Sequence, residues 1–594
     1  MKKTLRTTRL FAIFGAVLFL SACNVATETP TVTPVTPTLA PTELPTITPT
    51  ATMPRPAIQS ALPDHAEVGL YGAIDITVKA ETQKVNPYDA RIIRLDSVFT
   101  APDKTQMPIN GFWDGKDAWH IRFTPSQIGE WNYQLLLKDP GGISEPVSGK
   151  FTVSASDLHG AIQVGNKVNP SYSSHYLSYQ DGTPFYGIGH ADALNILSGF
   201  SLERGLPIFN AMQADNENYL VWWPFYTNSP ISSGYDQYSP SNMGVIDLVV
   251  REAEKKNIAL VFTIWDHPEL RDKTHAWGPG QWPANGFSKL GDINSFFTSA
   301  EAWAWQENLY RYIIARWGYS NAIGMWMTVS EINGTNAYDQ TNPWHEKVNA
   351  YFQNNDPYHH PTTASMSGDV DWPEGHKVMD VSQVHVYDFS NGSVKIDDTH
   401  ASAVLAHWTE LMWNQAEKPN WVGEYGVPSD ADYPEIFHNS NWAALASGAA
   451  MTPAEWNGGG SWGEMTQDMS DDMARLAKFV GELPLVKWNP APLKISTKDD
   501  NIRAWGVAGP DGGLIWVQNF TLEGKNIITI RKDRSQRKGV KLQIQGLPAG
   551  KYLFTPYNTW LGTYAKPIEV TCAETCELKM PTLHNDMAFK IEKK

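Results

Sequence analysis

The sequence is poor in cysteine, in charge and in long apolar runs. Its three cysteines, Cys23, Cys572 and Cys576, are too few for a cysteine-rich metal site. Charged residues make up 19% of the chain, and the formal net charge is −16. An acidic balance argues against a nucleic-acid partner, which needs a basic surface. The N-terminal apolar segment FAIFGAVLFL is too short to span a membrane.

Several catalytic motifs are also missing. No HExxH run is present, and no G-x-S-x-G nucleophile elbow occurs. The glycine-rich stretch NGGGSWG lacks the lysine and the spacing of a phosphate-binding loop. A metal-dependent hydrolase is the weaker alternative, because His190-Ala-Asp192 stands where that chemistry usually has His-x-His. We therefore expect neither a metal nor an organic cofactor.

Aromatic residues, in contrast, are abundant. The chain has 24 tryptophans, and Trp, Tyr and Phe together make up 12% of it. Flat rings on a surface can stack against sugar faces, whereas the same rings in large cores serve packing. For any single tryptophan the two interpretations are about equally good.

The N-terminus has the features of an export signal. A basic stretch, MKKTLRTTRL, precedes the apolar segment, and LSAC closes it. Leu20–Cys23 resembles a bacterial lipobox, which implies cleavage before Cys23 and lipidation of its sulfur. The alternative is a soluble secreted protein. Residues 24–60 form a Thr/Pro-rich tract that cannot build a core and reads as a linker. We expect a lipid-anchored protein on the extracellular face of a bacterial membrane, or a secreted one.

The remaining chain divides into three regions. Residues 61–156 and 485–594 consist of short alternating apolar runs separated by turn residues, which predicts two β-sandwiches. Residues 157–484 alternate apolar strand candidates with amphipathic stretches, which predicts an α/β (β/α)8 barrel, or TIM barrel. The eight candidate strands are 184–190, 218–226, 258–267, 323–331, 361–367, 380–388, 419–426 and 447–456.

Two of these strands end in a glutamate. Glu331 closes the fourth, in WMTVSEING, and Glu424 closes the seventh, in NWVGEYG. In a barrel these strands lie on opposite sides of the active-site mouth, so the side chains can converge. Two carboxyl groups about 5 Å apart suit a retaining glycosidase, in which one donates a proton and the other attacks the sugar. The structural alternative is a salt-bridged strand end.

These motifs resemble the clan A glycoside hydrolases. The resemblance implies that Glu331 is the acid/base and Glu424 the nucleophile. That family usually has Asn before the acid/base, where this chain has Ser330. The stretch 111–133, GFWDGKDAWHIRFTPSQIGEWNY, resembles the sandwich module that precedes many bacterial glycoside hydrolase barrels. Residues 546–564 resemble the small C-terminal sandwich attached to such barrels, where packing is a better explanation than glycan binding.

Further polar and aromatic residues stand at strand ends, where they can contact a sugar or simply occupy the rim. The predicted substrate-binding residues are His190, Asp192, Trp223, Trp265, His267, Ser330, His385, Tyr387, Trp456 and Trp462. Because alternate strand residues share a face, His385 and Tyr387 can both point into the mouth. Cys572 and Cys576 are candidates for a small disulfide loop, the alternative being two free thiols.

The sequence thus predicts a retaining hydrolase of O-glycosidic bonds in an extracellular poly- or oligosaccharide, with β linkages favoured. The alternative is a non-catalytic carbohydrate-binding lipoprotein with a degenerate barrel. Ser330 supports that alternative, whereas the intact pair Glu331 and Glu424 speaks against it. The sequence does not indicate which sugar or linkage is recognised, whether action is endo or exo, or what the oligomeric state is.

Overall fold

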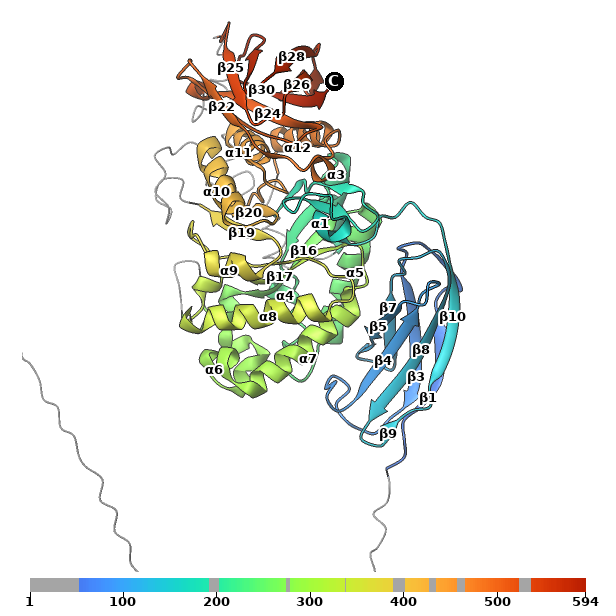
Figure 1. The fold of residues 1–594 in the computed structure, drawn as a ribbon. Coiled ribbons are helices and arrows are strands. Elements are labelled where there is room, and N and C mark those ends of the chain that lie inside the picture. The colour runs from blue at the N-terminus through green and yellow to red at the C-terminus, as the bar shows by residue number, and fades with distance from the viewer. Residues whose placement is uncertain are drawn as a thin grey trace, which may run out of the picture. The chain divides into compact units, whose positions relative to one another are not determined.

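The computed structural model describes residues 53–191, 202–273, 278–336, 338–387, 401–426, 434–456, 465–522 and 536–594. The predicted signal, Cys23, Asp192 and Trp462 lie outside these residues. The chain divides into two compact units, Met1–Thr52 and Met53–Lys594, and the second contains every described element (Figure 1). It is a mixed α/β structure with many sheets. No helix in the described part is long and apolar enough to cross a membrane.

The N-terminal part of this unit consists of two sheets around one core. One sheet has the order β1-β3-β7-β6, and the other has β2-β10-β8-β4-β5 with β9 beside β8. The strands are β1 (Ala57–Pro63), β2 (Glu67–Gly69), β3 (Ile74–Glu81), β4 (Arg94–Thr100), β5 (Gln106–Asn110), β6 (Phe112–Trp113), β7 (Trp119–Phe123), β8 (Gly129–Asp139), β9 (Gly142–Ile143) and β10 (Val147–Ser154). Alternate residues Ile74, Ile76 and Val78 are fully buried, as a two-residue period requires.

The first strand begins inside the predicted linker. Ala57–Pro63 pairs antiparallel with β3, with Ala57 opposite Glu81. The Thr/Pro composition hid this boundary, because a strand at a sheet edge needs few apolar residues. Strand β1 therefore includes the last four residues of the predicted linker, 57–60.

The central part contains parallel strands with helices between them. Short strands β11 (Ile162–Val164), β12 (Leu177–Tyr179) and β13 (Pro184–Phe185) precede it in a separate antiparallel sheet. A five-stranded parallel sheet follows, with the order β14-β15-β16-β17-β18, and β19 pairs with β20. These strands are β14 (Gly189–Ala191), β15 (Tyr219–Trp222), β16 (Ala259–Asp266), β17 (Ile323–Ser330), β18 (Thr362–Thr363), β19 (Ser382–Val386) and β20 (Asn420–Tyr425).

Further backbone hydrogen bonds join the edges of these parallel sheets. Val381 N donates to Thr362 O at 3.0 Å, which links the segment before β19 to β18. The eighth predicted strand, 447–456, forms isolated bridges rather than a strand in the described residues. Met451 bridges Gly187 and Glu455 bridges Tyr425, both in parallel. A strand of the predicted length is not formed there, although the segment is hydrogen-bonded on both sides.

The helices of the central part follow the strands in the chain. They are α1 (Gly165–Val168), α3 (Leu202–Ala214), α4 (Pro224–Asn228), α5 (Pro240–Lys256), α6 (Ile293–Thr298), α7 (Ala300–Trp317), α8 (Thr341–Asn355), α9 (Pro373–Val378), α10 (Ala401–Gln415), α11 (Pro434–Ser447), α12 (Gln467–Val480) and α13 (Leu485–Trp488). Short 3-10 turns are η1 (His267–Leu270), η2 (Trp282–Ala284), η3 (Gly286–Leu290), η4 (Ile332–Gly334), η5 (Tyr338–Gln340) and η7 (Phe520–Leu522).

Helix α5 illustrates how the sequence sets these elements. The hydroxyl of Ser239 caps its first turn, and Pro240 occupies the first helical position, where the missing N–H costs nothing. Met243, Ile246 and Val250 lie on one buried face. The helix ends at Asn257, whose φ of 56° is left-handed, a conformation that Asn tolerates well.

The C-terminal part again has two sheets around a core. One has the order β21-β23-β24-β30-β26-β27 with β28 beside β26, and the other is β22-β25-β29. Its strands are β21 (Ala491–Pro492), β22 (Lys494–Thr497), β23 (Ile502–Ala508), β24 (Gly512–Asn519), β25 (Lys541–Gln545), β26 (Gly550–Asn558), β27 (Thr563–Tyr564), β28 (Ile568–Cys572), β29 (Cys576–Lys579) and β30 (Asp586–Lys593).

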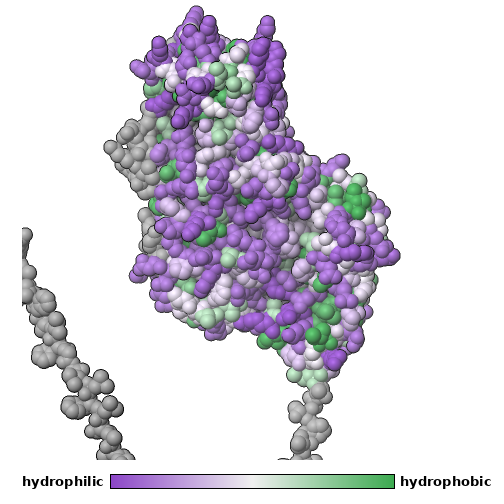
Figure 2. All heavy atoms as spheres, viewed as in Figure 1, coloured by the Kyte–Doolittle hydropathy of each residue, from purple (hydrophilic) through white to green (hydrophobic). Residues whose placement is uncertain are grey.

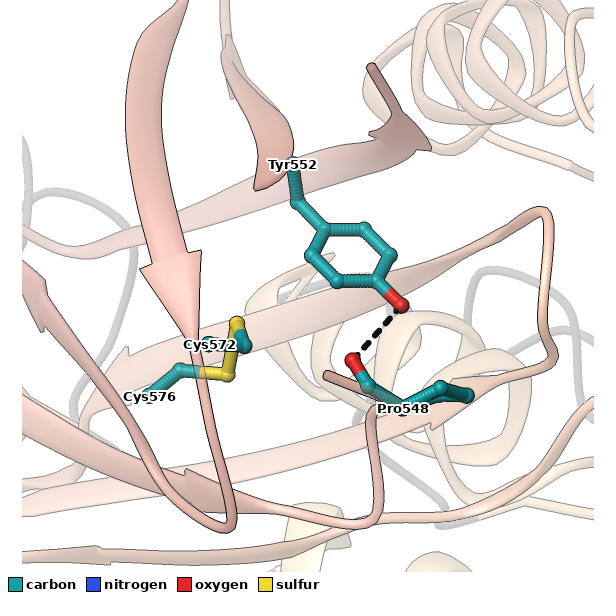
Figure 3. Close-up of a disulfide and its surroundings, with 4 residues drawn as sticks. All are labelled: Pro548, Tyr552, Cys572 and Cys576. Atoms are coloured by element: carbon teal, nitrogen blue, oxygen red, sulfur yellow. Dashed lines mark hydrogen bonds between the residues drawn. A yellow bond between two sulfur atoms is a disulfide. The ribbon is translucent and has the colours of Figure 1, made fainter. Parts of the chain in front are cut away.

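The two C-terminal cysteines form a disulfide. Cys572 and Cys576 lie at the facing ends of β28 and β29, and their sulfur atoms are bonded. Figure 3 shows this bond beside Tyr552, whose hydroxyl donates to Pro548 O at 2.9 Å. Both cysteines are buried, and the disulfide closes the connection between the two sheets. The disulfide prediction is therefore confirmed and the free-thiol alternative is wrong.

Buried ion pairs join the three parts within this unit. Asp247 on α5 accepts from Arg316 on α7 at 2.7 Å and from Arg122 on β7 at 3.1 Å. At the other end, His438 on α11 contacts Asp472 on α12 at 2.7 Å and Asp586 on β30 at 3.2 Å. Buried charges are tolerated only when they are paired, so both clusters fix how neighbouring parts pack.

Candidate active site

The two glutamates predicted from the sequence lie at neighbouring ends of parallel strands. Glu331 directly follows β17 and has a left-handed backbone, with φ 53° and ψ 53°. Its N–H donates to Ser365 Oγ at 3.0 Å, and its carbonyl accepts from Gly334 N at 2.8 Å. A left-handed conformation costs a residue other than glycine roughly 1–3 kcal/mol and persists only where its surroundings enforce it. The strained turn aims the Glu331 side chain away from the path of the strand.

His385 connects the two glutamates. Its Nδ1 lies 2.9 Å from Glu331 Oε1 and 3.2 Å from Glu424 Oε2. In the strand register His385 is the partner of Glu424, so β19 and β20 hold the two side chains next to each other. The ring is fully buried, and Nε2 has no hydrogen-bond partner among the described residues. A proton on Nδ1 points at the carboxyl pair and can be donated in a hydrogen bond to either carboxylate.

Tyr387 makes the second polar contact to Glu424. Its hydroxyl donates to Glu424 Oε2 at 2.8 Å. The Tyr387 backbone N–H donates to Asp369 Oδ1 at 2.7 Å, which holds the chain just past the end of β19. His385 and Tyr387 point to the same site because they are two residues apart at a strand end.

His267 approaches Glu331 from the other side. Its Nε2 lies 3.4 Å from Glu331 Oε2, and its Nδ1 lies 2.8 Å from Arg271 Nη1. A guanidinium can only donate, so His267 Nδ1 must accept and the ring proton is on Nε2. Arg271 thereby fixes the tautomer that donates toward Glu331. Glu331 thus faces two imidazole N–H groups, from His267 and His385.

Two more carboxyl groups surround this cluster. Asp266, the last residue of β16, and Glu269 form a capping box on η1. Burial, together with the charges of Glu269 and Glu331, raises the pKa of Asp266 well above its ordinary value. Burial raises the pKa of Glu269 to about 7. The raised pKa values favour the protonated form of both side chains, and protonation of either limits the negative charge gathered around Glu331.

The carboxyl pair has unequal proton affinities. Burial and the charge of Glu331 raise the pKa of Glu424 well above its ordinary value, although the Tyr387 hydrogen bond opposes this. For Glu331, burial alone would raise the pKa, but the contacts with His385 and the influence of His267 and Arg271 lower it. The unliganded site therefore favours an ionised Glu331 beside a protonated Glu424.

The other predicted site residues lie in different environments. His190 is buried at the centre of β14, with Nδ1 2.6 Å from Glu217 Oε2. Trp223, directly after β15, and Trp456, at the end of the eighth predicted strand, meet edge to face with ring centroids 5.1 Å apart. Trp265 is 1% exposed, and its indole N–H donates to Tyr310 at 2.8 Å, so this residue belongs to the core. Ser330 is buried next to Asp266 in the register of β16 and β17.

Several contributors were not among the predicted site residues. Arg271, Glu269, Ser365 and Asp369 all contact or support the central cluster. The Asp-His-Pro-Glu stretch at 266–269 carries a recognisable helix-capping signal. Arg271 has no such signal, because its role depends on a contact with His267 that sequence spacing does not reveal.

A metal ion is an alternative occupant of this cluster. Among the described residues, Glu331, His385 and Glu424 each offer a ligand atom, and these atoms lie within 4.8 Å of one another. The same atoms also satisfy one another, since His385 Nδ1 is in contact with both carboxyl groups. One imidazole and two carboxylates suit zinc and related cations. The geometry alone thus allows either a hydrogen-bonded carboxyl pair or a cation held by it.

Comparisons with known proteins indicate a glycoside-hydrolase-like fold. Residues 67–138 match a domain of unknown function, DUF5060. A structure described as a candidate glycoside hydrolase from Bacteroides vulgatus matches with a TM-score of 0.62 at 17% identity, covering 89% of this chain and 100% of the other. A family 5 glycoside hydrolase from the same species (TM-score 0.49, 14% identity, 73% and 95% covered) and a family 39 enzyme from Bacteroides cellulosilyticus (0.38, 12%, 87% and 96%) also match. No curated protein matches the chain.

The fold likeness supports the coarser part of the sequence interpretation. At 17% identity the Bacteroides vulgatus structure shares a fold with this chain, extending over nearly all of both. The DUF5060 match falls within the region predicted as the N-terminal module. The expected resemblance to glycoside hydrolases is thus confirmed at the level of fold.

Proposed function

We propose that the protein is a retaining glycoside hydrolase whose central part is a (β/α)8 barrel. Five parallel strand pairings, two isolated parallel bridges and the Val381–Thr362 hydrogen bond support this closure. Glu331 and Glu424 then stand at the carboxyl ends of the fourth and seventh strands, where such barrels place their chemistry. The substrate is an extracellular poly- or oligosaccharide, for which β linkages fit the family resemblance best.

The observation that carries this proposal is the spacing of the carboxyl pair. An oxygen of Glu331 and an oxygen of Glu424 lie no more than 4.8 Å apart. Retaining glycosidases have carboxyl groups about 5–5.5 Å apart, whereas inverting enzymes separate them by about 6.5–9.5 Å to admit water. The short spacing favours direct attack by one carboxylate on the anomeric carbon.

In the proposed reaction Glu424 attacks the anomeric carbon while Glu331 protonates the leaving oxygen. The bond from carbon to the leaving oxygen breaks, and a glycosyl ester forms on Glu424. Glu331, now ionised, takes a proton from water, and the water oxygen attacks the same carbon and releases Glu424. Two inversions give net retention. Tyr387 stabilises the carboxylate form of Glu424 by donating a hydrogen bond from its hydroxyl.

The proton must move within the pair when substrate binds. The unliganded site favours the proton on Glu424, but the attacking carboxylate must be ionised. A glycosidic oxygen only accepts hydrogen bonds, so a sugar placed against Glu331 favours the protonated form of that residue. The electron-poor anomeric carbon favours the ionised form of Glu424. We propose that these two contacts reverse the order of the pKa values in the complex.

A non-catalytic glycan-binding protein is the second candidate. The same unliganded pKa order favours it, because an ionised Glu331 held by two imidazoles cannot donate a proton. Ser330 also replaces the asparagine that the related family uses to contact the sugar. A binding site does not require its two carboxyl groups to exchange a proton. This candidate therefore predicts tight glycan binding without turnover.

For the whole chain, we propose a lipid-anchored extracellular protein with three folded domains. Residues 1–23 would be the signal and 24–60 mostly linker, with Cys23 carrying the lipid. The domains would cover about 57–156, 157–484 and 485–594, the outer two being β-sandwiches. The two-sheet cores at either end support this division.

Azide rescue tests the mechanism and the roles together. A variant with Glu424→Gly, assayed on aryl β-glycosides, lacks the nucleophile, so azide attacks directly and yields the inverted glycosyl azide. In Glu331→Gly, azide replaces the base and attacks the ester, yielding the retained product. NMR of the products distinguishes these outcomes, and the reverse assignment would exchange the two roles. Activity that chelation abolishes and zinc restores would instead favour the metal alternative.

A further inference from the structure

A half-buried tryptophan lies at the boundary between the C-terminal sheets and the central helices. Trp505 on β23 stacks beside the fully buried Trp516 on β24, with ring centroids 5.7 Å apart and planes inclined by 19°. The two residues are register partners and therefore share one face of the sheet. Trp516 is anchored by its indole N–H, which donates to Asp586 at 3.0 Å. Trp505 is thus held rigidly by its neighbour while part of it faces solvent.

Two hollows meet at Trp505. One has a volume of about 490 Å³ and extends toward α10 and α11, and the other has about 380 Å³ and extends along the turn at 497–503. Both are lined by Ser496, Ala504 and Trp505. Because they share these walls, an extended ligand can occupy both and pass the indole on its way.

Polar side chains line the larger hollow on the sheet side. Lys494 and Ser496 on β22 stand opposite Gln545 and Gln543 on β25 in the strand register. All four are exposed, whereas the alternating residues of both strands face the core. This outer face offers amide and hydroxyl groups that both donate and accept hydrogen bonds. Figure 1 shows β22 and β25 next to each other beyond α10 and α11, away from β17.

The central helices form the opposite wall. Glu410 on α10 and Ser447 at the end of α11 line the same hollow. Ser447 is 2% exposed, and its hydroxyl has no hydrogen-bond partner among the described residues. Burial also raises the pKa of Glu410.

The chemistry of this site fits a neutral sugar chain. The cationic residues Lys494 and Arg503 are offset by Glu410, Asp499 and Asp500, so neither an anionic nor a cationic polymer is favoured. A flat indole can cover the apolar face of a pyranose, and amides, hydroxyls and carboxylates can bond to its rim of hydroxyl groups. On the face shown in Figure 2, apolar residues form small separate patches among hydrophilic ones, so no large apolar surface there competes as a docking site.

We propose that these two hollows form a glycan-binding site, centred on Trp505, that is separate from the carboxyl pair. It takes a segment of a neutral polysaccharide, with one sugar ring against Trp505 and its hydroxyls bonded by Gln543 and Gln545. This site goes beyond the proposed hydrolysis, because it holds the polymer without acting on it. No residue that lines it belongs to the Glu331–Glu424 cluster.

The test is affinity electrophoresis of the full chain in gels containing β-glucan, mannan, xylan, galactan or arabinan. All proteins carry Glu424→Gln, so that turnover does not consume the polymer. The site variants are Trp505→Ala and the double variant Gln543→Ala/Gln545→Ala, whose two side chains are exposed and whose removal leaves the core intact. The matched controls are Trp303→Ala, a partly buried tryptophan on α7, and Gln134→Ala on the exposed face of β8.

We expect retardation in at least one gel, with an apparent dissociation constant that rises about tenfold or more in both site variants, or ~1.4 kcal/mol. The controls should behave like the parent. Unchanged retardation in both site variants would overturn the proposal, as would retardation in none of the five gels. A dimer that Trp505→Ala converts to a monomer would also overturn it, by showing that a second copy occupies the groove. Hydrolysis is measured separately, in proteins without Glu424→Gln, and its outcome does not decide whether this binding site exists.

Discussion

Nδ1 of His385 lies 2.9 Å from Oε1 of Glu331, and the same nitrogen is 3.2 Å from Oε2 of Glu424. One fully buried imidazole thus contacts both carboxyl groups of the pair. Because it donates to whichever group is ionised, His385 controls how the pair shares its proton. The roles of the two glutamates therefore depend on a residue that is itself not proposed to react.

Replacing His385 should shift the pH profile of the reaction. His385→Ala removes a hydrogen bond that lowers the pKa of Glu331, so that pKa should rise. If Glu331 is the acid, the alkaline limb of kcat, which reports the enzyme–substrate complex, moves to higher pH. His385→Asn, whose amide nitrogen can replace Nδ1, should restore most of the original profile. His407→Ala on α10 is the control and should leave both limbs in place. An unchanged profile in His385→Ala would show that this contact has no influence on the acid.

Tyr387→Phe should make Glu424 a poorer nucleophile. The hydrogen bond from the Tyr387 hydroxyl lowers the pKa of Glu424. Removing the hydroxyl therefore raises that pKa further and reduces the ionised fraction of Glu424 at any given pH. The acidic limb of the kcat profile, which reports the enzyme–substrate complex, should move to higher pH. A hydrogen bond to a charged group is worth roughly 1.5–3 kcal/mol, which corresponds to about a 10- to 100-fold loss of kcat/KM. Steady-state kinetics from pH 4 to 9 measure both effects. Full activity in Tyr387→Phe would argue against an anionic Glu424 in the reaction.

Asp247→Asn should weaken the junction between the N-terminal sheets and the central helices. Asp247 accepts from Arg316 and Arg122, and these contacts lower its pKa to about 2 against the opposing effect of burial. Without the carboxylate, the buried guanidinium of Arg316 loses its counter-charge, while Arg122 keeps its contact with Asp75. Breaking such a buried pair costs roughly 3–5 kcal/mol. We expect a clear fall in the midpoint of urea unfolding. Asp117→Asn, at an exposed pair with Lys79, should change it little. Equal effects in the two variants would contradict a special role for Asp247.

The His438 cluster should make stability depend on alkaline pH. Burial alone would lower the pKa of His438, but Asp472 and Asp586 raise it to about 9, from an ordinary value of 6.5. A folded-state pKa above the unfolded one stabilises fully below pH 6.5, and the contribution is lost as pH rises toward about 9. The contribution is on the order of 3 kcal/mol. Urea unfolding at several pH values should show this fall, and His438→Gln should flatten it. A parallel slope in both proteins would contradict the assignment.

The sequence predicted the long buried strands better than it predicted short or half-exposed ones. Long apolar runs such as 258–267 and 323–331 became β16 and β17 because such runs are buried on both faces. The segment 447–456 formed only bridges, since Gly448 and Pro453 interrupt it. Strand β1 was missed because it is half exposed and looks like linker.

The candidate site was predictable where it depended on position along a strand. Glu331, Glu424, His385 and Tyr387 all stand at strand ends, and the structure brings them together. Trp265 was misjudged, because its neighbour Asp266 takes the inward direction and leaves the indole in the core. The left-handed turn at Glu331 could not be found, since it is held by Ser365, which is distant in the sequence. Arg271 could not be found either, because its contact with His267 matters only once His267 lies against Glu331.

The measurement that tests the central claim most directly is release of reducing sugar from β-glucan, mannan, xylan, galactan and arabinan. The protein from Ala57 onward is compared with Glu424→Gln and Glu331→Gln, together with Glu374→Gln, an exposed carboxylate on α9, as a control outside the pair. The account predicts release from at least one polysaccharide, a loss of roughly a thousandfold or more in each of the two pair variants, and little change in the control. Release that survives in either pair variant, or none from any substrate in the parent protein, would contradict it.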